Sequence, residues 1–149
     1  MRLTPIAVAV LSLSIGMAYA ADDPILSRKA LMDSNAAAAA MAGAMLKGDM
    51  PYNAAAGKSA IAALHATAHA YGAFFPDDSK TGDHTSASPK IWSDRAGFEK
   101  ALAKFQAATD AAMKASGREG PTDLASFKSA IGPVLGNCKS CHQDYRVSQ

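Results

Sequence analysis

Residues 53–75 read Asn-Ala-Ala-Ala-Gly-Lys-Ser-Ala-Ile-Ala-Ala-Leu-His-Ala-Thr-Ala-His-Ala-Tyr-Gly-Ala-Phe-Phe, and Pro76 follows. Small and apolar residues recur in this stretch at alternating steps of four and three: Gly57, Ile61, Leu64, Ala68, Tyr71 and Phe75. That period places them on one face of an α-helix, as in a helix that packs into the core of a bundle. We expect the helix to end at Pro76, which cannot continue it.

A second helical stretch precedes this one and is bounded on both sides. Asp23 is a residue type that caps helix N-termini, and Pro24 suits the first helical position. Apolar and small residues follow at three- and four-residue steps: Ile25, Met32, Ala36, Ala39, Gly43 and Leu46. Gly48 is a typical helix stop, and Pro51 lies shortly beyond it.

Two more helices are predicted in the C-terminal half. The first follows Ser93 or Asp94 as its cap and stops at Gly117. Its apolar face holds Phe98, Leu102, Phe105, Thr109 and Ala112. The second is capped by Thr122, and Pro133 should kink it. Its apolar face holds Leu124, Phe127, Ile131, Val134 or Leu135, Cys138, Cys141 and Tyr145.

Together these stretches predict an all-α protein, an antiparallel four-helix bundle with two short connections and one long one. Abundant alanine and only 7% aromatic residues agree with helix. The long connection, residues 76–91, is polar, and we expect it to cross over along the length of the bundle. A loop of this length can instead be functional, and its few apolar anchors predict high mobility.

Residues 1–20 are interpreted as a secretory signal peptide, which leaves residues 21–149 as one domain. Arg2 gives the positive start, and Ala18-Tyr19-Ala20 fits a cleavage site after a short apolar run. An uncleaved membrane anchor is the alternative. The chain has 15 basic and 13 acidic residues, and without Arg2 its formal charge is +1. This balance argues against nucleic acid or a membrane surface as a partner.

The segment Cys138-Lys-Ser-Cys141-His142 carries the chemistry. C-x-x-C-H is the attachment signature of c-type haem, in which each thiol adds across a haem vinyl group to form a thioether. Residues at i, i+3 and i+4 share one face of a helix, so the two sulfurs and the imidazole point the same way. The sequence therefore predicts one covalent haem c near the C-terminal helix, with His142 as an axial iron ligand.

Three other readings of the two cysteines stay open. A thioredoxin-like dithiol would need a βαβ setting, which the helical pattern does not offer. A zinc site could join Cys138 and Cys141 to His65 and His69, which are four residues apart, but it would leave His142 without a role. A plain disulfide is the third reading, since the chain is expected to be exported. The last two would make the domain a structural module without haem.

The chain resembles the class II c-type cytochromes, which include the high-spin cytochromes c′ and the low-spin cytochromes of the c-556 type. Four stretches carry the resemblance: Arg28-Lys-Ala-Leu-Met-Asp-Ser-Asn35, Gly48-Asp-Met-Pro-Tyr52, Ser88-Pro-Lys-Ile-Trp-Ser-Asp94 and Cys138 to Arg146. The resemblance covers essentially the whole mature chain. It implies an electron carrier or gas-binding protein and not an enzyme. The small side chains of residues 36–40 keep us from carrying over the family's dimer contacts, so a homodimer stays open.

The resemblance also assigns roles around the iron. Met32, four residues after Arg28, matches the position that faces the distal side of the haem, where a thioether would be the sixth ligand. The alternative is a core methionine and a five-coordinate iron that binds nitric oxide or carbon monoxide. Arg28 is expected to pair with a haem propionate or to be solvated, and Arg146 to shield the proximal side. The predicted function is a periplasmic electron carrier with redox partner proteins.

Three large residues are expected to serve packing alone. Met41 and Met45 lie farther along the first helix and are assigned to the core. Trp92 is read as a packing anchor at the start of the third helix and not as an electron relay.

Overall fold

The computed structural model of the chain describes residues 23–82 and 84–147, so the predicted signal peptide lies outside the described residues. The four long helices are α1 (Pro24–Lys47), α2 (Ala54–Ala70), α4 (Arg95–Ser116) and α5 (Leu124–Tyr145). The shorter elements are the 3-10 turns η1 (Tyr71–Phe74) and η2 (Asp77–Ser79) and the one-turn helix α3 (Lys90–Ser93).

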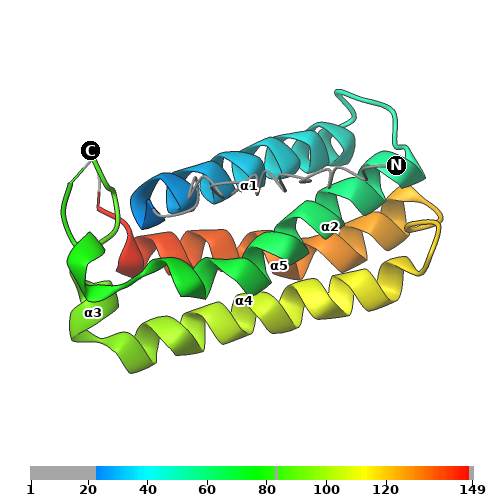
Figure 1. The fold of residues 1–149 in the computed structure, drawn as a ribbon. Helices are drawn as coiled ribbons and strands as arrows, with labels where there is room; N and C mark the ends of the chain where they lie inside the picture. The colour runs from blue at the N-terminus through cyan, green and yellow to red at the C-terminus, as the bar shows by residue number, and fades with distance from the viewer. Residues whose placement is uncertain (1–22, 83, 148–149) are drawn as a thin grey trace, which may run out of the picture.

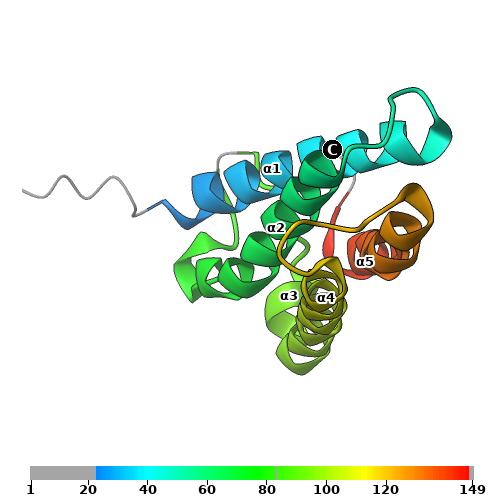
Figure 2. The same cartoon turned by 90° about the vertical axis from the view of Figure 1, so that its right-hand side faces the viewer.

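The long helices run alternately up and down, which confirms the predicted antiparallel four-helix bundle (Figure 1). In Figure 2 the molecule is turned by 90° from the view of Figure 1, and the four long helices surround a common interior. Within the described ranges there is no strand, only an isolated bridge between Ala87 and Arg146. No helix in those ranges is long and apolar enough to cross a bilayer.

The predicted start and stop of α1 are confirmed. The Oδ1 of Asp23 accepts hydrogen bonds from the backbone N–H groups of Ile25 and Leu26, at 2.8 and 3.0 Å. Gly48 ends the helix with φ 83°, a left-handed conformation that glycine adopts without a steric penalty.

Two other predicted boundaries need correction. α2 ends at Ala70, and the last predicted turn is instead the tighter 3-10 turn η1 before Pro76. The cap of α5 is Asp123 and not Thr122, because the Oδ1 of Asp123 accepts the backbone N–H of Ser126 at 2.7 Å. For α4 the structure selects Asp94 as the cap, while Ser93 ends α3.

The larger hydrophobic cluster fills one end of the bundle. Its buried members come from all four long helices: Ala38, Ala42, Met45, Ala60, Ile61, Leu64, Ala112, Phe127, Ile131 and Val134. Met41 packs against them from its partly buried position, so the core assignment of Met41 and Met45 is confirmed. We refer to this region as the packed end.

A smaller cluster lies at the other end of the bundle, and it consists of Phe75, Ile91, Phe98 and Tyr145. The ring of Phe75 makes edge contacts with Phe98 and with Trp92, at centroid distances of 4.8 and 5.9 Å. Trp92 also donates its Nε1–H to the Pro76 carbonyl at 3.2 Å, as expected of a packing anchor.

The long connection does not cross over along the bundle, and that prediction is wrong. α2 and α4 pack against each other as antiparallel neighbours, so the chain needs only to turn at one end (Figure 1). The connection instead folds over that end of the bundle and reaches the end of α5. There the Ser88 N–H donates to the Tyr145 carbonyl at 3.0 Å, and the Val147 N–H donates to the Ser86 carbonyl at 2.9 Å.

Candidate functional site

The end of the bundle beneath this loop contains a cavity of about 480 Å³, lined by α1, α4, α5, Tyr71 and the loop. Its size lies within the range of small-molecule and cofactor pockets, roughly 300–1,000 Å³. The largest apolar side chains in its wall are Ile25, Ile91, Phe98, Leu102 and Phe105. α1 and α5 pack less extensively against each other than the other neighbouring pairs do. The cavity therefore lies where these two helices leave room for a bulky apolar group.

Cys138, Cys141 and His142 all line this cavity, as the spacing on one helix face predicts. Both cysteines are half-buried free thiols, so no disulfide joins them. Burial raises the pKa of both thiols, which keeps them protonated at neutral pH. Two adjacent thiols at a cavity wall are what attachment of a vinyl-bearing macrocycle requires.

His142 lies at the exposed edge of the cavity beside Arg146. Partial loss of hydration, and then the positive charge of Arg146, lower the pKa of His142. The neutral imidazole is the form that binds metal ions, so this setting favours its use as an iron ligand. Arg146 itself lines the cavity and is exposed, and its shielding role stays a prediction.

Met32 reaches the same cavity from α1, which places it and His142 on different walls. Asn35, one turn farther along α1, also lines the cavity, and its buried Oδ1 has no hydrogen-bond partner among the described residues. A buried polar atom without a partner costs about 1–3 kcal/mol, which indicates a cavity built to hold a further group. The apolar wall, two thiols, imidazole and thioether together fit a c-type haem.

Arg28 lines the cavity but is not solvated, since it is only 3% exposed. Its guanidinium donates to the carbonyls of Phe74 and Ser79 and to the Ser79 hydroxyl, each at 2.9 Å. A fourth bond runs to the Thr85 hydroxyl at 3.3 Å, and the guanidinium stacks 4.7 Å from the Phe75 ring centroid. Arg28 therefore connects the loop to α1. Its pairing with a haem propionate stays a prediction, and few of its N–H groups are left to donate to a propionate.

Sequence reasoning missed several parts of the cavity wall. Asn35 lies one helical turn after Met32, and this spacing predicts that both side chains lie on the same face of the helix. Tyr71 also lines the cavity, and burial raises its pKa to about 12, which keeps its hydroxyl neutral. The loop residues 84–87 complete the wall, and no pattern in the sequence predicted their place.

The zinc alternative is wrong, because the structure separates its four ligands. His65 and His69 are absent from the cavity wall that holds Cys138 and Cys141. Both imidazoles instead contact the carboxylate of Asp110 on α4. The face of α2 that carries the two histidines is therefore turned toward α4.

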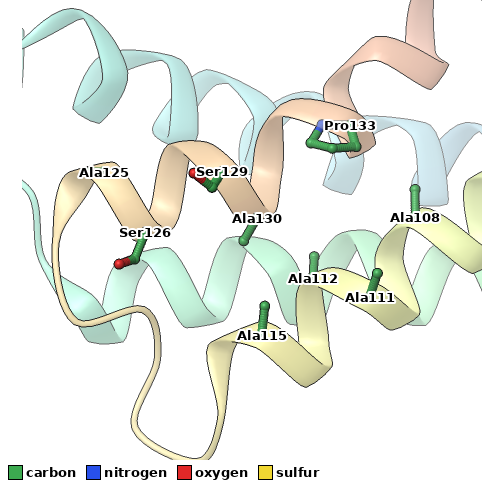
Figure 3. A pocket seen from close by; sticks show the side chains of 9 residues that line it. All are labelled: Ala108, Ala111, Ala112, Ala115, Ala125, Ser126, Ser129, Ala130 and Pro133. Carbon is green, nitrogen blue, oxygen red and sulfur yellow. The ribbon is translucent and has the colours of Figure 1, made fainter.

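A second hollow, of about 580 Å³, lies between α4 and α5 (Figure 3). Only alanine, serine and proline side chains line it: Ala108, Ala111, Ala112, Ala115, Ala125, Ser126, Ser129, Ala130 and Pro133. These side chains are short and offer no metal ligand or titratable group. The hollow is therefore a groove left by small residues, and none of the predicted haem-site residues lines it.

Comparison with known proteins agrees with this site. The chain is 42% identical over 137 residues to a cytochrome c′ of Rhodopseudomonas palustris, covering 92% of this chain and 90% of the relative. It is 32% identical over 151 residues to a cytochrome c-556 of Agrobacterium fabrum, covering 100% and 99%.

Solved structures give the same result. The cytochrome c′ structure from Rhodopseudomonas palustris superposes with a TM-score of 0.76 at 42% identity, covering 85% of this chain and 98% of that one. The structure of oxidized cytochrome c556 from the same organism gives 0.73 at 31% identity, with the same coverage. The sequence model of the Cytochrome C′ family matches residues 23–146. The chain therefore belongs to the cytochrome c′ family, the class II c-type cytochromes, whose members carry one covalent haem c.

Proposed function

We propose that the chain is an exported monohaem electron carrier in which Cys138 and Cys141 hold the haem and His142 and Met32 bind its iron. The observation that carries this proposal is that Met32 on α1 and His142 on α5 line the same cavity as both thiols. A haem attached through the cysteines would lie between the imidazole and the thioether. His/Met ligation raises the potential and suits electron transfer.

Several residues of the cavity would have separate roles in holding the haem. Two thioether bonds would fix one edge of the macrocycle to α5, and the neutral His142 would present its lone pair to the metal. Phe98, Leu102 and other apolar side chains of the cavity wall would shield the bound haem from water. The haem, when bound, supplies an iron that gains and loses one electron. Because α1, α4 and α5 fix most of the cavity wall, little rearrangement should accompany that change.

A five-coordinate, gas-binding protein is the second candidate. It is favoured by the higher identity to the cytochrome c′ of Rhodopseudomonas palustris, 42%, than to the cytochrome c-556 of Agrobacterium fabrum, 32%. In this case Met32 packs in the distal wall without binding the iron. Nitric oxide or carbon monoxide would then bind in the space beside Met32 and Asn35.

Export and partners follow from the sequence. The features of residues 1–20 support a cleaved signal peptide and a periplasmic location. The nearly balanced charge argues against nucleic acid as a partner. Redox partner proteins follow from the proposed electron transfer. We infer an electron carrier or gas-binding protein and not an enzyme, and membership of the cytochrome c′ family supports this.

An absorption and electron-paramagnetic-resonance comparison of wild type and Met32→Ala tests the ligation. We expect a low-spin wild type, a high-spin variant that binds carbon monoxide, and a lower reduction potential in the variant. Met41→Leu is the matched control on the same helix, since Met41 packs against the core, and its spectrum should equal that of wild type. A high-spin spectrum of the wild-type protein would contradict Met32 ligation and favour the gas-binding function. It would not affect the assignment of Cys138 and Cys141 to covalent haem attachment.

A further inference from the structure

The side chains of His65, His69 and Asp110 converge between α2 and α4, outside the lining of the haem cavity. The Nε2 atoms of His65 and His69 lie 2.9 and 2.8 Å from the same Oδ1 of Asp110. The centroids of the two imidazole rings are 4.5 Å apart. One ligand-type atom from each residue lies within 4.8 Å of the others.

Helix spacing and a hydrogen bond between α4 and α2 bring these three side chains together. His65 and His69 are one turn apart on α2, so they lie on the same face of the helix. Gln106, one turn before Asp110 on α4, donates its Nε2–H to the Ala68 carbonyl at 3.0 Å. This bond joins α4 to α2 next to the histidines. The three side chains are 33%, 47% and 54% exposed, so an ion in solution can reach them.

We propose that His65, His69 and Asp110 bind one divalent transition-metal ion of the kind that prefers imidazole, with zinc and copper as the best fits. Two imidazole nitrogens and one carboxylate oxygen form a donor set that suits these ions. Three protein ligands leave a position for water, as in open zinc sites. Magnesium and calcium prefer all-oxygen sites and should not compete.

The geometry needs little adjustment to accept an ion. Ligand bonds of roughly 2.0–2.1 Å in a tetrahedral site put neighbouring ligand atoms about 3.3 Å apart. The two nitrogen–oxygen distances of 2.9 and 2.8 Å would therefore open by about half an ångström, which half-exposed side chains can supply by small rotations. The Oδ1 of Asp110 already faces both imidazoles, so a carboxylate ligand is in place between them.

The competing explanation is a purely hydrogen-bonded cluster in which each imidazole donates an N–H to Asp110. The two explanations differ in their response to metal. A bound ion would join α2 to α4 and would stabilise the folded state in proportion to its concentration. A hydrogen-bonded cluster would show no saturable response.

Isothermal titration of Zn²⁺ into the untagged, haem-loaded protein at about pH 7.5 tests the proposal. We expect one saturable site and a rise in the melting temperature with zinc. His65→Ala and Asp110→Asn should each weaken binding by at least about tenfold, and the double variant should show no saturable binding. Cu²⁺ should bind more tightly than Zn²⁺, and Mg²⁺ should not bind.

Glu99→Gln is the matched control, because Glu99 is an exposed carboxylate on α4 that pairs with Arg95 at 2.9 Å and lies outside the cluster. Its zinc affinity should equal that of wild type. An unchanged haem spectrum will show that each variant is folded. The proposal is overturned if wild type shows no saturable zinc binding, if the cluster variants bind zinc as tightly as wild type, or if Mg²⁺ binds equally well.

Discussion

The same four helices pack in two different ways at the two ends of the bundle. At the packed end, small residues such as Ala42 and Ala60 are fully buried and let α1 and α2 come close together. At the other end, which we call the cavity end, larger residues such as Phe98 stand around a cavity of about 480 Å³. One bundle therefore combines a close-packed end with an end that contains a cavity.

The difference shows what each end depends on. The packed end is stabilised by burial of apolar side chains from all four helices and needs nothing from outside the chain. The cavity end has two free thiols and a buried Asn35 oxygen that finds no partner in the described part of the chain, so its interior is completed by a cofactor. Substitutions at the cavity end should alter haem attachment or the haem spectrum. Substitutions at the packed end should alter only the free energy of unfolding.

The largest effect is expected from Cys138→Ser combined with Cys141→Ser. Without the two thiols no thioether can form, so covalent haem should be lost completely. Haem staining on a denaturing gel measures this directly. Ser140→Ala, between the two cysteines, is the control and should stain like wild type. A stained band from the double variant would contradict the assignment.

The next prediction compares the effects of replacing two phenylalanines, one at each end of the bundle. Phe127 is 0% exposed at the packed end, and Phe127→Ala should lower the free energy of unfolding by about 3–5 kcal/mol. Its haem spectrum should match that of wild type, because Phe127 does not line the cavity. Phe98→Ala should destabilise the protein and also shift the spectrum. Denaturant titration and absorption spectra of both variants check the contrast, and a spectral shift in Phe127→Ala would refute it.

The sequence predicted the packed faces of α2 and α4 for a physical reason. It was wrong about the face of α1, where Ala38, Ala42 and Met45 are buried and Ala36 is exposed. A repeat of apolar residues such as Ile61 and Leu64 reports burial directly, since the helix period fixes which side chains share a face. The C-x-x-C-H motif placed Cys138, Cys141 and His142 in one cavity for the same reason. These predictions depend on contacts within one helix, where local geometry is sufficient.

The loop and Arg28 could not be predicted in this way. The partners of Arg28 are 46 to 57 residues away in the chain, and no periodicity relates residues so distant. The sequence predicted a loop with few apolar anchors and high mobility. The structure shows that polar contacts replace those anchors, since one buried guanidinium holds Phe74, Ser79 and Thr85 together.

A smaller effect is therefore expected from Arg28→Met, at about 2–3 kcal/mol of unfolding free energy. The substitution leaves the carbonyls of Phe74 and Ser79 without their donor. Amide hydrogen exchange should become faster at Ser79 and Thr85, whose N–H groups are hydrogen-bonded within the loop in wild type. Arg28→Lys should restore only part of the protection, because an ammonium cannot reproduce the planar fork. Equal exchange rates in wild type and Arg28→Met would show that the loop is held by other contacts.

The smallest effect concerns the cap of α5, at the packed end. Asp123→Asn should lower the melting temperature slightly at neutral pH and leave the haem spectrum unchanged, because Asp123 lies outside the cavity wall. The hydrogen bond from the Ser126 backbone N–H lowers the pKa of Asp123 in the folded protein. A carboxyl whose pKa is lowered by folding contributes stability above its unfolded pKa, about 3.9, and loses it as the pH falls through the folded value. The melting temperatures of wild type and Asp123→Asn should thus differ at neutral pH and converge below about pH 4. A difference that stayed constant over this range would mean that the charge of the cap contributes nothing, and that Asp123 acts only through the shape of its side chain.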